Sequence, residues 1–128
     1  MKILLDTHAM LWLVTGHRRL SKKAKSIFLD GGNTLLLSAV SGFEIAVKYS
    51  LGKLELSEEP ASFIQKRIQA NAVTVLPLRM EHAGRLASLP FHHRDPFDRL
   101  LVAQAMIEQV PILSADRALS AYDIERVW

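Results

Sequence analysis

The sequence predicts an α/β protein, a compact three-layer α/β/α arrangement around a central parallel sheet of four to five strands. Short apolar runs without polar alternation recur along the chain, which is typical of strands buried on both faces. Segments with helical periodicity separate these runs, and this alternation favours a parallel sheet. The 128 residues contain no linker, internal repeat or low-complexity tract, so we expect one domain spanning residues 1–128.

In the first half of the chain, the apolar runs Ile3–Leu5 and Leu35–Leu37 predict buried strands. Helix boundaries are marked by Gly16, which follows the first helix, and by Ser21, which can cap the second. The expected elements are strand Lys2–Asp6, helices Thr7–Val14 and Lys22–Leu29, strand Thr34–Leu37, and helices Val40–Leu51 and Pro60–Asn71.

In the second half, a β-branched run predicts a strand at Val73–Leu76. The longest helix is expected to begin with Asp95 as its cap and Pro96 at its favoured first position. The expected elements are strand Val73–Leu76, helices Met80–Leu89 and Pro96–Gln109, strand Pro111–Ser114, a short helix Ala115–Ala121 and a terminal strand Glu125–Trp128.

The composition narrows the class of protein. A hydrophobic content of 49% with 23% charged residues indicates a folded, soluble protein. The absence of cysteine excludes disulfides and thiolate metal sites. No apolar stretch is long enough for a signal core or a membrane span, so we expect a cytoplasmic protein without a membrane partner. The net charge of +3 is mildly basic and suits a polyanionic substrate.

Four acidic residues stand where a strand is expected to pass into a helix. They are Asp6, Glu44, Asp98 and Asp116. The carboxyl ends of parallel strands meet at one edge of the sheet, where ligands bind. Carboxylates brought together there repel one another unless a cation holds them. The pattern therefore indicates a divalent-metal site, most naturally for Mg²⁺ or Mn²⁺, which prefer oxygen ligands.

Each of these acids also has a structural explanation. Asp6 and Asp116 can cap helices, and Asp98 lies in a first helical turn, where the helix dipole favours an anion. Glu44 can complete a capping box with Ser41 or pair with Lys48 one turn later. Their equivalent positions give the metal site equal standing with four independent structural roles, because caps are also common where strands pass into helices.

Neighbouring residues have candidate supporting roles. Capping explains Asp95 best, with a water-mediated metal contact as the alternative. Ser114 can orient a carboxylate or a water, or can be an ordinary hydroxyl at a strand end. Arg94 and Arg99 are candidate phosphate contacts, and Arg99 can instead form an ion pair beside the pocket. The histidines lack zinc-ligand spacing, so we expect them on the surface or at the substrate rim.

Several segments together resemble a PIN domain, and more narrowly a VapC-type toxin of a toxin–antitoxin pair. The resemblance covers nearly the whole chain and is strongest at His93–Ala105. Phe43 departs from the tryptophan usual in the family, and Ser114 stands where threonine is commoner. The matching segments are Leu4–Ala9, Ser38–Lys48, Gly52–Leu54, His93–Ala105 and Leu113–Asp116.

The resemblance implies a metal-dependent endoribonuclease that cleaves RNA by metal-activated water. Asp6, Glu44, Asp98 and Asp116 match the family's acidic quartet, and Asp95 matches a less central acid. Asp6, Asp98 and Asp116 would hold the metal. Glu44 would bind a second ion or orient the attacking water. The family also implies a homodimer and an inhibitory antitoxin partner.

Two other classes of protein remain as alternatives. One is a catalytically silent PIN-like binding module, against which the intact acidic quartet argues. The other is a small Mg²⁺-binding phosphoacceptor domain, which would need clustered acids at the first strand and a late lysine. Asp6 stands alone there, and no lysine follows Lys66, so this alternative ranks lower.

Overall fold

Five parallel strands form one sheet in the computed structural model, which describes residues 1–128. Their order across the sheet is β3-β2-β1-β4-β5, and every neighbouring pair is parallel. The predicted α/β fold with a parallel sheet is therefore confirmed. The strands are β1 (Lys2–Leu5), β2 (Thr34–Ser38), β3 (Thr74–Leu76), β4 (Ile112–Leu113) and β5 (Arg126–Val127).

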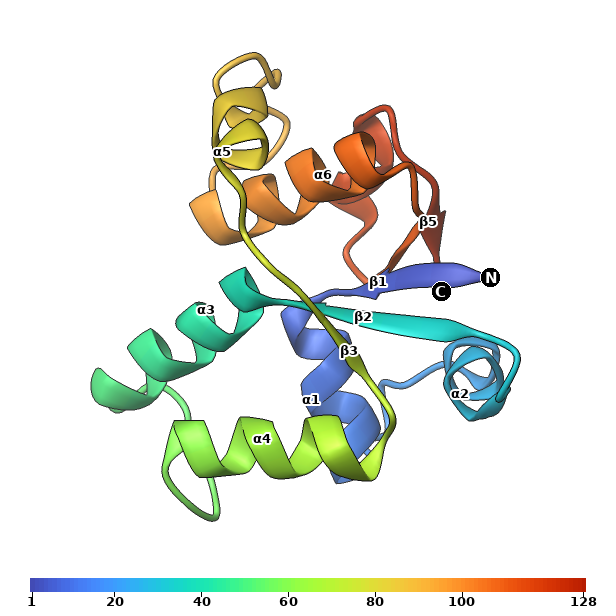
Figure 1. Ribbon diagram of the computed structural model, residues 1–128, viewed down its shortest axis with the longest axis vertical. Coiled ribbons are helices and arrows are strands. Elements are labelled where there is room, and N and C mark those ends of the chain that lie inside the picture. The colour runs from blue at the N-terminus through green and yellow to red at the C-terminus, as the bar shows by residue number, and fades with distance from the viewer.

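Helices cover both faces of the sheet (Figure 1). The side chains of β1 alternate between two separate cores: Ile3 and Leu5 belong to one, and Leu4 belongs to the other. Helices α1, α2 and α4 lie over the first core, and α5 and α6 lie over the second. The helices are α1 (Thr7–Thr15), α2 (Lys22–Leu29), α3 (Ala39–Ser50), α4 (Pro60–Ala70), α5 (Met80–Leu86), α6 (Pro96–Glu108) and the 3₁₀ helix η1 (Arg117–Ala121).

The central strand β1 marks a change in the direction in which the sheet is built. The chain adds β2 and β3 on one side of β1, and then crosses to place β4 and β5 on the other side. In open parallel sheets, ligands bind at such a switch point, beyond the carboxyl ends of the strands. Residues that follow β1 and β4 are therefore at the favoured position for a site.

The first residue of a helix differs from the sequence prediction at two places, although the cap Asp116 is as predicted. Helix α3 begins at Ala39 because Ser38 is its cap and accepts a hydrogen bond from the Val40 amide. Ser41 is thus inside the helix, and the predicted capping box with Glu44 is wrong. The last helix is a 3₁₀ helix that begins at Arg117, since Asp116 caps it through the Ala118 amide.

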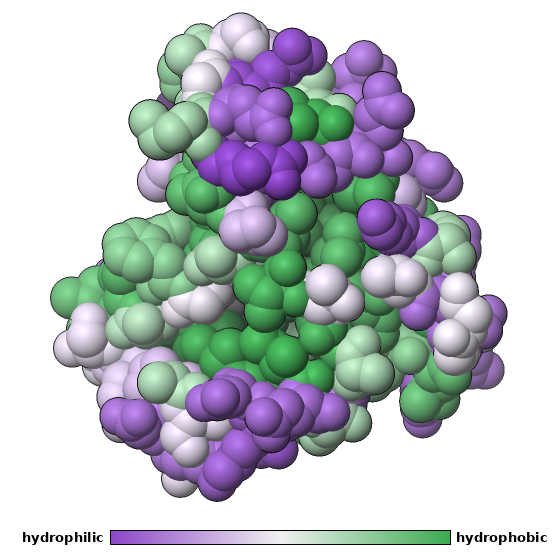
Figure 2. Space-filling model, viewed as in Figure 1, coloured by the Kyte–Doolittle hydropathy of each residue, from purple (hydrophilic) through white to green (hydrophobic).

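The surface carries an apolar face on the side of the edge strand β3. Figure 2 shows apolar side chains gathered over the region between α5 and α4. A hollow of about 460 Å³ on the protein surface is lined by Ala39, Val40, Phe43, Leu78, Pro96, Phe97 and Leu100. None of the helices combines the length and apolar character needed to cross a membrane.

Candidate metal centre

Asp6 lies at the carboxyl end of β1 and caps helix α1. Its Oδ1 accepts a hydrogen bond of 2.6 Å from the Ala9 amide, and its Oδ2 accepts one from the Ser114 hydroxyl. The residue is only 5% exposed. Burial raises the pKa of the Asp6 carboxyl, and these two hydrogen bonds oppose the rise. Asp6 is therefore a helix cap whose carboxylate is also fixed from a second strand.

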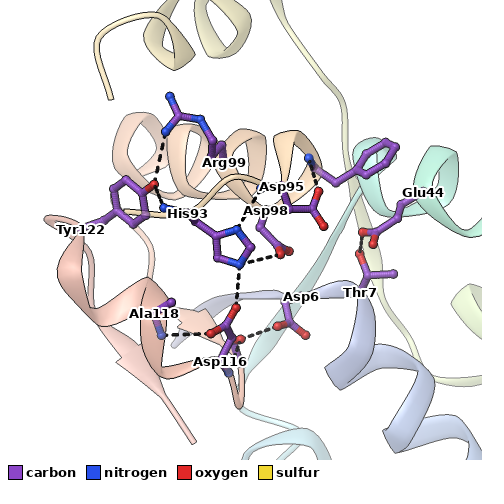
Figure 3. Close-up of polar contacts among 12 residues, drawn as sticks. Asp6, Thr7, Glu44, His93, Asp95, Asp98, Arg99, Asp116, Ala118 and Tyr122 are labelled. Carbon is purple, nitrogen blue, oxygen red and sulfur yellow. Dashed lines mark hydrogen bonds and ion pairs between the residues drawn. The ribbon is translucent and has the colours of Figure 1, made fainter. Parts of the chain in front are cut away.

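Ser114 joins the ends of β1 and β4. Its hydroxyl donates to Asp6 and accepts a hydrogen bond of 3.0 Å from the Asp116 amide. Asp116 in turn caps η1 with Oδ1, which leaves Oδ2 directed toward the centre (Figure 3). One buried hydroxyl thus sets the relative positions of two candidate metal ligands.

His93 connects Asp116 with Asp98. Its Nε2 lies 2.9 Å from Asp116 Oδ2 and 3.2 Å from Asp98 Oδ2 (Figure 3). Its Nδ1 accepts a hydrogen bond of 3.0 Å from the Asp95 amide. Since Nδ1 accepts, Nε2 carries the proton and donates toward the carboxylates. Asp95 itself caps α6, because its Oδ1 accepts from the Phe97 amide at 2.9 Å.

Asp98 has a strongly perturbed acidity. Burial and then the negative charges of Asp95 and Glu44 raise its pKa to about 7, while His93 acts in the opposite direction. A divalent cation would remove this repulsion and favour the ionised carboxylate. The centre thus has the electrostatic character expected of a cation site.

Glu44 is 1% exposed and is already engaged by side chains of the protein. Its Oε1 accepts a hydrogen bond of 2.7 Å from Thr7, and its Oε2 lies 2.6 Å from the Lys48 ammonium. The predicted pairing of Glu44 with Lys48 is therefore present. Figure 3 places Glu44 and Thr7 on the α1 and α3 side of the centre, apart from His93 and Asp116.

The residues of the centre form a close group of three, with Asp6 and Glu44 around it. His93, Asp98 and Asp116 offer ligand atoms that all lie within 4.8 Å of one another. Asp6 joins them through Ser114, and the charge of Glu44 acts on Asp98. The three carboxylates of Asp6, Asp98 and Asp116 are an oxygen donor set that suits Mg²⁺ or Mn²⁺, while the protonated Nε2 of His93 donates to two of them. A second such group, Glu81, His82 and Glu108, lies elsewhere and is engaged by Arg79.

The two predicted phosphate contacts have different surroundings. Arg94 is exposed, with no side-chain partner within the protein. Arg99 is 6% exposed, and its guanidinium donates to the carbonyls of Pro90 at 2.8 Å and Leu89 at 3.3 Å. Buried guanidinium donors need such internal partners. Arg99 therefore fixes the loop before α6, which differs from the predicted phosphate contact and from the predicted ion pair.

Sequence reasoning missed His93 as a member of the centre. The histidines lack zinc-ligand spacing, and the partner Asp116 lies 23 residues from His93 in the chain. A local signal was nevertheless present. His93 stands two residues before the cap Asp95, which is close enough for its ring to accept the Asp95 amide.

Comparison with known proteins identifies the family of this chain. The fold and the centre define an α/β protein with an acidic cluster at the switch point of a parallel sheet. Residues 3–125 match the PIN domain, so the chain belongs to the PIN domain family.

One curated relative matches about half of the chain, and two solved structures match nearly all of it at low sequence identity. Ribonuclease VapC16 of Mycobacterium tuberculosis is 39% identical over 71 residues, which cover 52% of this chain and 49% of VapC16. The structure of VapBC2 from Rickettsia felis bound to a promoter DNA fragment has a TM-score of 0.74 at 13% identity, covering 99% and 98% of the two chains. DNA-bound VapBC from Salmonella typhimurium has a TM-score of 0.74 at 15% identity, covering 99% and 97%. At these identities the structural likeness is one of fold.

Proposed function

We propose that this chain is a cytoplasmic endoribonuclease that depends on Mg²⁺ or Mn²⁺ and acts as the toxin of a toxin–antitoxin pair. The observation that carries the proposal is the convergence of Asp98 and Asp116 on His93 beside Asp6, with the pKa of Asp98 raised to about 7. Acids held this close at a sheet switch point need a cation to be ionised together.

Asp6, Asp98 and Asp116 would hold the ion. When bound, the metal lowers the pKa of a water and stabilises charge on the phosphate that is cleaved. Ser114 and the Ala9 amide keep Asp6 oriented, so its carboxylate needs little reorganisation. The proton on His93 Nε2 holds the carboxylates of Asp98 and Asp116 close together.

We assign Glu44 the orientation of the attacking water, in preference to the binding of a second ion. Both of its oxygens already accept hydrogen bonds, from Thr7 and from Lys48. The Lys48 ammonium partly neutralises Glu44, which reduces its attraction for a further cation. Arg94, which has no side-chain partner within the protein, remains the candidate phosphate contact at the rim.

The proposed partners are an RNA substrate, an antitoxin and a second copy of the chain. VapC16 is named a ribonuclease, and structural neighbours are complexes of the VapBC type, which supports the first two. The exposed side chains of Phe43, Val75 and Leu78 support a homodimer on the side of β3, because large apolar surfaces commonly mark interfaces.

Cleavage of a mixed RNA pool by purified, antitoxin-free protein tests the activity. Cleavage is expected with Mg²⁺ or Mn²⁺ and not with EDTA, and it should be lost in Asp98→Asn. Because water attacks, the products should carry 5′-phosphate and 3′-hydroxyl ends. A 2′,3′-cyclic phosphate would contradict this mechanism. Absence of cleavage from the folded protein in every metal would favour the catalytically silent binding module.

A further inference from the structure

An open hollow extends from the acidic centre along helix α1. Its volume is about 540 Å³, and it is lined by Asp6, His8, Trp12, Arg19, Ala115 and Asp116. No other hollow on the surface is lined by any of the four candidate acids. A nucleic-acid strand bound across Asp6 and Asp116 would therefore lie next to this hollow.

The wall of the hollow farthest from the acids along α1 is aromatic. Trp12 and His8 stand four residues apart on one face of α1, with ring centroids 6.0 Å apart. His17 stacks on Trp12 at 5.2 Å with an interplanar angle of 19°. The indole is only partly buried, and both histidines are exposed. One planar group, the His17 ring, already stacks on this indole, as a nucleobase does on an aromatic platform, whereas the His8 ring is tilted by 48°.

Packing against the protein accounts for the contact of Trp12 with Trp128, but not for the partly exposed surface of its ring. Its ring meets the Trp128 ring edge-on at 5.8 Å, a contact typical of aromatic packing. A purely structural tryptophan would be closed off by apolar neighbours. Here the other aromatic and cationic side chains beside the ring, His8, His17 and Arg19, are all exposed.

Arg19 supplies a positive charge beside this platform. Its guanidinium carbon lies 5.9 Å from the centre of the Trp12 ring, and the residue takes part in none of the ion pairs of the chain. Arg79 and Arg99, by contrast, have their donors committed to acids or carbonyls. An uncommitted guanidinium near an aromatic ring suits a phosphate next to a stacked base.

We propose that this hollow binds the nucleotide next to the cleaved phosphate, with its base stacked on Trp12 and its outer phosphate held by Arg19. The ligand class is single-stranded RNA, since a base can reach Trp12 only when it is unstacked from a helix. This proposal rests on the proposed nuclease function, because it takes the acids as the place of cleavage.

The test measures binding, so that it does not depend on turnover. The protein carries Asp98→Asn to prevent cleavage, and the probes are a fluorescein-labelled single-stranded RNA decamer and an abasic decamer with the same phosphates, in Mg²⁺. Trp12→Leu, which keeps an apolar side chain without a ring, should weaken decamer binding about tenfold and leave abasic binding unchanged. Trp12→Phe should retain most of the affinity.

The role of Arg19 is tested by comparing it with the neighbouring Arg18. Arg19→Ala should weaken binding of both decamers several-fold, because it removes a phosphate contact. Arg18→Ala is the control, since Arg18 is also exposed but lines a different hollow. Equal losses for Arg19→Ala and Arg18→Ala would overturn the subsite, as would a Trp12→Leu variant that binds the decamer like its parent.

A second measurement covers the case in which Trp12→Leu does not fold. In a Trp128→Phe background, Trp12 is the only tryptophan, and a stacked base should quench its fluorescence. The decamer should quench it and the abasic decamer should not. Quenching by both probes, or by neither, would contradict base stacking. If wild-type protein fails to cleave RNA while these binding differences hold, the subsite stands and the nuclease function falls.

Discussion

The four acids of the centre form two pairs with different surroundings. Asp98 and Asp116 share one imidazole proton, and their side chains are 20% and 39% exposed. Asp6 and Glu44 are 5% and 1% exposed, and their oxygens accept hydrogen bonds from the protein itself. The more exposed pair is open to ligands, while the buried pair is already organised before any ligand arrives. Removing a charge should therefore have different consequences in the two pairs.

The largest effect should come from Asp6→Asn. Asparagine caps helices as well as aspartate does, so the fold should persist. Loss of the charge removes a candidate metal ligand, and RNA cleavage should fall about a thousandfold, a size typical of groups that act directly on developing charge. Cleavage rates and thermal unfolding by circular dichroism check both parts. Unchanged cleavage would reduce Asp6 to a helix cap.

Glu44→Gln should cost stability as well as cleavage, which separates it from Asp6→Asn, because Asp6→Asn should leave the stability of the fold nearly unchanged. Thr7 can still donate to the new amide oxygen, but the partly buried Lys48 loses its counter-ion. The free energy of unfolding in urea should fall by roughly 1–3 kcal/mol. The double variant Glu44→Gln with Lys48→Met, which removes both charges, should recover part of the loss. If Glu44→Gln is as stable as the parent, the ion pair of Glu44 and Lys48 contributes nothing to the free energy of unfolding.

The raised pKa of Asp98 predicts a pH dependence of stability in metal-free protein. The unfolded chain releases this proton near pH 3.8, while the folded protein keeps it until about pH 7. The stabilising contribution is therefore present below about pH 4 and is lost as pH rises through 7. Relative to Asp98→Asn, the free energy of unfolding in EDTA should fall by roughly 2–4 kcal/mol between pH 4 and 8.

Parallel stability curves for wild type and Asp98→Asn would contradict this account. At pH 8, Mg²⁺ should restore stability to the wild type and have little effect on Asp98→Asn, because an ion that binds the folded state stabilises it.

The smallest effect expected is that of Ser114→Ala, which leaves all four acids in place. Without the Ser114 hydroxyl, Asp6 loses one of the two groups that orient it. Affinity for Mn²⁺, measured by calorimetry, should fall about tenfold, as is common for groups that position metal ligands. Ser26→Ala on the exposed surface of α2 is the control. Equal affinities in the two variants would show that Asp6 needs no help from Ser114.

Much of the fold could be predicted because its signals are local. The uninterrupted apolar residues Ile3–Leu5 indicate a strand buried on both faces, and each face does meet its own core. Asp95 and Pro96 mark the start of α6, which begins at Pro96 as expected. The family and the fold class are accordingly confirmed, and the roles of the acids stay proposals.

The details that sequence did not predict depend on contacts between distant residues. Ser38 and Ser41 are both plausible caps, and the structure uses Ser38, whose hydroxyl also donates to Gln104, 66 residues away. Arg99 is a cation by sequence, but carbonyls of the preceding loop surround it once α5 packs on α6. Only the folded chain brings His93 to Asp116.

The hydrogen bond from Ser114 to Asp6 joins residues 108 positions apart, and β1 lies between β2 and β4. During translation the first strand is made long before β4 and Asp116. The acidic centre is therefore incomplete until residues 112–116 have been made and have joined the sheet beside β1. A proposed RNA-cleaving centre divided in this way cannot form from the first part of the chain alone.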